Sequence, residues 1–111
     1  MQDLIIEIGE KLKQLNVSVK MLRKSGTEYA QAENDYKILL SQESLKLKDS
    51  GMAVTLIDKV VYGLPSVAKK RFQRDVAKTV YFANQEAIQA IKLEIRILDN
   101  QIQREWGGDG D

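Results

Sequence analysis

Residues 54–75, VTLIDKVVYGLPSVAKKRFQRD, decide the fold, because they contain the only proline of the chain and its densest run of positive charge. A short apolar segment, a Gly63-Leu64-Pro65 turn and a basic segment can be read as a helix-turn-helix that grips DNA. They can equally be the connection at the tip of a long helical hairpin. The segments on either side of this stretch decide between the two interpretations.

The segment before it has the spacing of a long helix. Apolar residues recur at alternating spacings of four and three, which on a helix form one narrow face for a partner helix. The same phase continues beyond Gly26 to Tyr29, Tyr36, Leu40 and Leu47. We therefore expect one helix over about residues 2–48, with a possible kink at Gly26, although Ser25 and Glu28 also form a capping-box pattern that could start a new helix. The first residues of the stripe are Met1, Ile5, Ile8, Leu12, Leu15, Val19 and Leu22.

The connection is short and has its own start and stop signals. Gly51 suits the left-handed position that ends a helix. Thr55 and Asp58 form a capping pair for a short helix over 54–62, which Gly63 closes. Pro65 can occupy the first turn of a last helix over 65–106. The acidic, glycine-rich stretch 107–111, GGDGD, is expected to form a disordered tail.

These elements predict an all-α fold with a single domain over residues 1–106. The connection is too short to lead back along a helix of this length, so the two long helices must be antiparallel. The expected architecture is a coiled-coil-like helical hairpin with a short connecting helix at its tip. The residues expected to carry the fold are Ile5, Ile8, Leu12, Leu15, Leu22, Ile88, Ile91, Ile95, Leu98 and Ile102.

The last helix has more apolar surface than one partner helix requires. One line contains Tyr81, Ile88 and Ile95, with Asn84 in the same phase, and a second line contains mostly small residues. Further apolar residues lie off both lines, so self-association is the economical explanation. For Trp106, the expectation is a place in the core beside Met1 and Ile5, and the alternative is an aromatic and acidic tail offered to a partner. The residues predicted to self-associate are Phe82, Leu93, Ile97, Val17 and Met21.

Composition excludes several kinds of chemistry. The 111 residues include no cysteine and no histidine, which removes disulfides, thiol nucleophiles, histidine acid–base catalysis and Cys/His zinc sites. No carboxylate pair or glycine-rich phosphate loop is recognisable, so we expect no enzyme activity, no metal and no cofactor. The N-terminal stretch is acidic where a signal peptide needs a basic region, and no window reaches the ~20 apolar residues of a membrane span. We expect a cytoplasmic protein that does not enter a membrane.

Segment 66–80 is the one candidate for nucleic-acid contact. Lys70, Arg74 and Lys78 follow an i, i+4, i+8 line that could track a phosphate backbone. Against this, the net charge of the chain is only +1, and such lines are common on solvated helix faces. The candidate contacts are Lys69, Lys70, Arg71, Arg74 and Lys78.

The stretches TLIDKVVYG and VAKKRFQRDVAKTVYFANQEAIQAIKLEIRILDNQIQREW resemble a group of small uncharacterised helical proteins encoded by phages and prophages of Gram-positive bacteria. This resemblance covers most of the chain and implies a bacterial host cell as its setting. It transfers no catalytic residue. The expected function is that of a non-enzymatic interaction or scaffold protein, a homo-oligomer that binds an unknown phage or host protein. The alternative is a nucleic-acid-binding accessory protein of phage replication or recombination that uses segment 66–80.

Overall fold

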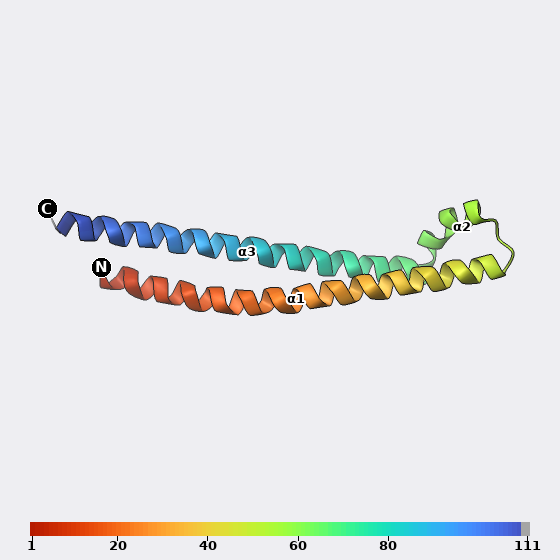
Figure 1. Ribbon diagram of the computed structural model, residues 1–111, viewed down its shortest axis with the longest axis horizontal. Coiled ribbons are helices and arrows are strands. Elements are labelled where there is room, and N and C mark those ends of the chain that lie inside the picture. Colours follow the sequence, from red (N-terminus) through yellow and green to blue (C-terminus); the bar gives the residue numbers. More distant parts are fainter. Residues whose placement is uncertain (110–111) are drawn as a thin grey trace. The chain divides into compact units, whose positions relative to one another are not determined.

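The protein is all-α, as predicted. The computed structural model describes residues 1–109, with side-chain burial described for residues 1–107, and these residues contain no β-strand. Two long helices are joined by a short helix and a 3₁₀ turn (Figure 1). The elements are α1 (Gln2–Asp49), α2 (Val54–Val60), η1 (Val61–Gly63) and α3 (Pro65–Asp109).

Helix α1 passes through Gly26 without a break, as expected from the continuous apolar phase. The capping-box pattern of Ser25 and Glu28 starts no helix, and Ser25 is instead buried. Gly26 lies against an aromatic ring, because a Cβ atom added to it would lie 3.4 Å from Cε1 of Tyr81. The absence of a side chain at this position lets Tyr81 approach the backbone of α1.

Helix α1 ends in a Schellman motif built on Gly51. The backbone N–H of Gly51 donates to the carbonyl of Lys48 at 3.0 Å, and that of Met52 donates to the carbonyl of Leu47 at 3.2 Å. Gly51 has a φ of +92°, a left-handed conformation that only glycine adopts at little cost. The prediction for Gly51 is confirmed.

The start of the short helix differs from the prediction. Its N-cap is Ala53, whose carbonyl accepts from the N–H groups of Leu56 and Ile57, and no side chain caps it. The predicted capping pair of Thr55 and Asp58 is therefore wrong. Both residues lie one or more positions inside α2, too far along the chain to cap its first N–H groups.

The start of α3 matches the prediction, but its end does not. Pro65 is its first residue, where a missing N–H costs no hydrogen bond. At the other end the helix continues through Gly107 to Asp109, rather than stopping at Trp106. Glycine lowers helix propensity but keeps its N–H, so it weakens a helix without ending it as proline does. The rest of the predicted tail, residues 110–111, lies outside the described residues.

The chain forms two compact units, and each contains a segment of α1 and a segment of α3. The terminal unit comprises Met1–Lys24 and Phe82–Asp111, and the central unit comprises Ser25–Tyr81. In both units, contacts pair rising residue numbers on α1 with falling numbers on α3, so the segments are antiparallel, as in a helical hairpin. The prediction of a single domain stays a prediction.

The best-packed part of the molecule is the core of the central unit. Tyr36 of α1, Ile57 of α2, Val61 of η1 and Val67 of α3 are buried against one another, and Val67 is completely inaccessible. Helix α2 and η1 thus supply a third side to the pair of long helices. Residues 54–75, which allowed two interpretations in the sequence, thus contribute most of this core. Partly buried residues around it are Leu39, Leu40, Leu47, Met52 and Leu64.

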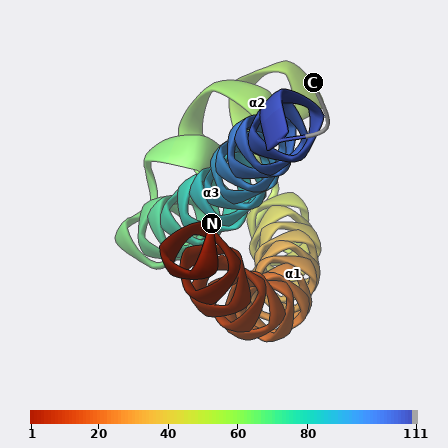
Figure 2. The same cartoon turned by 90° about the vertical axis from the view of Figure 1, so that its left-hand side faces the viewer.

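The terminal unit has only two helices and therefore buries less. Figure 2 views this end of the molecule, with the first turns of α1 in red and the last turns of α3 in blue. Among its described residues, Ile88 and Leu98 are the buried apolar side chains. Ile5 and Leu12 were predicted to carry the fold, but both are exposed. The packed face of α1 is rotated away from them, which leaves other positions, including Lys11, half-buried instead.

Candidate functional site

Two ion pairs join α1 and α3 in the terminal unit. The N-terminal amino group of Met1 lies 3.4 Å from Glu105, and the Lys11 ammonium group pairs with Glu94. The hydrogen bond that Lys11 donates to the Glu94 carboxylate raises the pKa of Lys11 above its ordinary value of 10.5. Since Lys11 occupies a half-buried position on the packed face, this pair helps to fix the register of the two helices.

The outer face of α3 in this unit carries exposed apolar side chains. Phe82, Leu93 and Ile97 are 47%, 52% and 53% exposed. At about 100° per residue they lie roughly opposite Ile88 and the other positions that pack on α1. These three residues of the predicted self-association set are thus exposed at the surface of the terminal unit.

Val17 and Met21 are also exposed, but they lie elsewhere. Val17 lines a shallow groove of about 380 Å³ together with Ile91 of α3. Ile91 and Leu93 are two positions apart, about 200° around the helix, so the groove and the outer face open on different sides of α3. The predicted set is therefore two surfaces rather than one.

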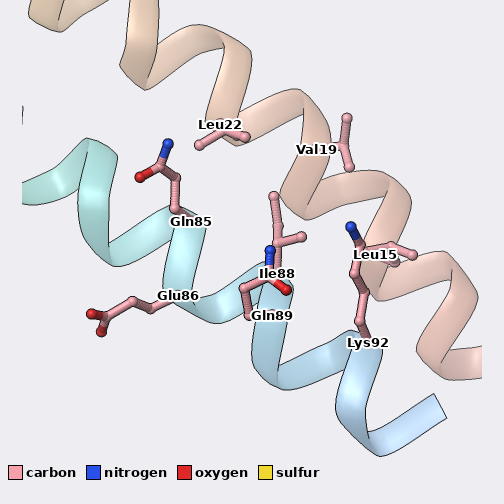
Figure 3. Close-up of a pocket in the computed structure, with 8 residues that line it drawn as sticks. All are labelled: Leu15, Val19, Leu22, Gln85, Glu86, Ile88, Gln89 and Lys92. Atoms are coloured by element: carbon pink, nitrogen blue, oxygen red, sulfur yellow. The ribbon is translucent and has the colours of Figure 1, made fainter. Parts of the chain in front are cut away.

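A second groove of about 500 Å³ runs between α1 and α3 in the terminal unit (Figure 3). Apolar side chains from both helices form its floor, and Figure 3 shows Ile88 directed from α3 toward α1. Amide and charged groups of α3 form one rim. The groove is open and contains no cluster of acid–base or nucleophilic groups, so its chemistry is that of a packing surface. Its lining residues are Leu15, Val19, Leu22, Gln85, Glu86, Ile88, Gln89 and Lys92.

The central residue of the predicted nucleic-acid line is engaged within the central unit. The Arg74 guanidinium lies over the ring of Tyr36, 4.7 Å from its centroid. Its Nε and Nη2 both donate to Oδ1 of Asp75, at 3.0 and 2.8 Å. This hydrogen bonding to Asp75 raises the pKa of Arg74. The guanidinium group therefore stays charged, but it is engaged by Tyr36 of α1 and by the adjacent Asp75.

Two residues of the basic line, Lys70 and Arg74, lie on the packed side of α3, whereas the third, Lys78, is exposed. Half-buried or buried positions recur at spacings of three and four through Val67, Lys70, Arg74, Ala77 and Tyr81. Extending the phase of the last helix backwards from Tyr81 would have revealed this. Lys69, Arg71 and Lys78 are exposed, and so are three apolar residues of the same helix, Phe72, Val76 and Val80.

The expectation for Trp106 is wrong. Its side chain is 66% exposed, whereas a residue packed against Met1 and Ile5 would be buried. Ile5 is exposed as well, because the packed face of α1 does not include it. Trp106 therefore adds apolar surface to the terminal unit.

Metal sites and membrane spans are two further features to consider in the part of the chain that the structure describes. There, no three His, Cys, Asp or Glu side chains come together as metal ligands. None of the described helices has a segment both long and apolar enough to cross a membrane.

Comparison with known proteins gives no family assignment: no family model, no curated protein and no solved structure matches this chain. The resemblance to phage-encoded helical proteins therefore stays a prediction. The uncovered apolar surface of the terminal unit is the feature on which a function can be argued.

Proposed function

We propose that this chain is a non-enzymatic interaction protein that self-associates through the outer face of α3 and serves as a helical scaffold for other proteins. The observation that carries the proposal is the exposure of Phe82, Leu93 and Ile97 along one side of a helix. The opposite side of the same helix is already occupied by α1, so this face is a second packing surface.

The small number of buried side chains in the terminal unit supports the same proposal. A two-helix pair cannot enclose a core, because each helix has only one neighbour. The central unit gains a third side from α2 and η1, and its core residues are accordingly more numerous. A further helix packed on the terminal unit would give it the third side that α2 and η1 give the central unit.

The alternative function, nucleic-acid binding through segment 66–80, has less support. Arg74 is held by Tyr36 and Asp75, and Lys70 is half-buried. The line that would follow a phosphate backbone is thus partly turned toward α1. A phage or host protein as a further partner rests on the sequence resemblance alone.

Sedimentation equilibrium over a range of concentrations tests self-association. The expected result is an average mass that rises above the 12.6 kDa of one chain. Leu93→Glu should lower the association, because it places a charge in the apolar face. Gln73→Glu adds the same charge at an exposed position of α3 in the central unit, outside that face, and is the matched control. A chain that stays monomeric at high micromolar concentration would contradict the proposal.

A further inference from the structure

The outer face of α3 contains a symmetric pattern of four exposed side chains. An acidic and a basic residue lie at its ends, two large apolar residues lie near its centre, and the spacings are seven, four and seven. The two end residues are eighteen positions apart, about five full turns, so they lie on the same side of the helix. The central pair lies about 20° to either side of that line. The four residues are Glu86, Leu93, Ile97 and Arg104.

Among the described residues, the side chains on this side of α3 are exposed rather than packed on α1. Ile88 and Leu98, the buried residues of the terminal unit, point away from it, toward α1. Within the described residues, no ion pair involves Glu86 or Arg104, although Glu94 and Glu105 of the same helix both have partners on α1. Two opposite charges thus remain available at the ends of an exposed apolar pair.

We propose that a second copy of the chain packs antiparallel on this face, about a two-fold axis at the level of residue 95. The inference rests on the proposed self-association and specifies its geometry. Residues at equal distances from residue 95 then face each other across the interface. Glu86 of each copy meets the partner's Arg104, and Leu93 of each copy meets the partner's Ile97.

Charge complementarity selects this orientation. In the antiparallel arrangement both ends of the interface bring together opposite charges, which stabilises the pair. A parallel pair in register would place Glu86 against the same residue of the other copy, and Arg104 likewise, so both ends would repel. Ala90 lies between the charged and apolar positions, and its small side chain permits close approach of the two helices.

The apolar part of the interface is small, which limits its strength. Only two large residues from each copy lie at its centre, and exposed ion pairs contribute only about 0.2–1 kcal/mol each. We therefore expect a weak dimer, with a dissociation constant in the micromolar range or above, that weakens further as salt is added.

Charge reversal tests the pairing. Glu86→Lys should raise the dissociation constant about tenfold or more at low salt, because two attractive contacts become repulsive. Arg104→Glu should do the same. The double variant Glu86→Lys/Arg104→Glu should restore wild-type affinity, since it exchanges the two charges of every pair. Circular dichroism of each variant should show unchanged helix content.

Cysteine cross-linking tests the orientation directly, because the chain contains no native cysteine. Ala90 and Asn100 are equidistant from residue 95, so protein with Ala90→Cys mixed with protein with Asn100→Cys should form a disulfide between the two chains. Ala90→Cys alone should not, because the two cysteines would be about 15 Å apart along the helices, too far for a disulfide.

The outcomes separate the two proposals. A wild-type chain that never associates would overturn both. Association that is unaffected by either single reversal, or efficient cross-linking of Ala90→Cys with itself, would leave self-association in place and overturn the antiparallel arrangement.

Discussion

The guanidinium of Arg74 lies 4.7 Å above the ring centroid of Tyr36, and this contact joins α3 to α1 in the central unit. Tyr36 is buried in the core of that unit, while Arg74 also donates to Asp75. A cation over an aromatic face is attracted by the electrons of the ring. A residue that the sequence suggested for phosphate binding is thus part of the hairpin itself.

We expect a double-mutant cycle of Tyr36→Leu and Arg74→Met to give a coupling free energy of about 0.5–1 kcal/mol, in the direction of stabilisation, because Arg74 is partly exposed. Urea denaturation of the two single variants and the double variant measures it. Tyr36→Phe is the control, since it keeps the ring and should retain the coupling. A coupling near zero would mean that the contact contributes nothing to stability.

For nucleic acid, we expect no binding to duplex or single strands tighter than about 10⁻⁴–10⁻⁶ M at physiological salt, the ordinary non-specific range. Fluorescence anisotropy with labelled oligonucleotides measures it. If binding is nevertheless tight, Lys69→Glu/Arg71→Glu is the informative variant, because both side chains are exposed and their reversal leaves the packing intact. Reversal of Lys70 and Arg74 would disturb the contact with α1 as well. Salt-sensitive nanomolar binding that is lost in the Lys69→Glu/Arg71→Glu variant would favour the nucleic-acid function.

Replacing three glycines by alanine should have different effects on thermal stability. Gly51→Ala should lower the free energy of unfolding by about 1–2 kcal/mol, because in the left-handed conformation of Gly51 an added Cβ atom would lie too close to the backbone. Gly9→Ala should stabilise by about 0.5–1 kcal/mol, since it lies in a helix with nothing within 4 Å of the added atom. Gly26→Ala should gain less than Gly9→Ala, because its methyl group meets the Tyr81 ring. An equal gain at Gly9 and Gly26 would show that the ring moves freely.

The ion pair of Lys11 and Glu94 should make stability depend on pH in the alkaline range. The pKa of Lys11 is raised above 10.5 in the folded state, so the pair contributes fully below pH 10.5. This contribution is lost as the pH rises through the higher folded-state pKa. Thermal unfolding between pH 9 and 12 should therefore show a steeper loss for the wild type than for Lys11→Arg, whose guanidinium stays charged. Identical curves would mean that the pair does not affect folding.

The sequence by itself determined the helices. The three- and four-residue spacing predicted α1 through Gly26, and Gly51 and Pro65 marked the end of one helix and the start of the next. These features are local, because a left-handed φ, a missing N–H or a helical period depends on residues within a few positions of one another. The antiparallel direction also followed, since the connection is short.

Only the tertiary structure decided which face of each helix is packed. Ile5 and Leu12 fit the apolar stripe, yet both are exposed. Lys11, which lies between them in the sequence, faces α3 because it forms an ion pair with Glu94 there. In the same way Arg74 is turned inward by Tyr36, while the apolar Phe72 of the same helix is exposed. A charged side chain can occupy the packed face only when its partner on the other helix is in place. That pairing joins residues far apart in the sequence, and spacing along one helix does not contain it.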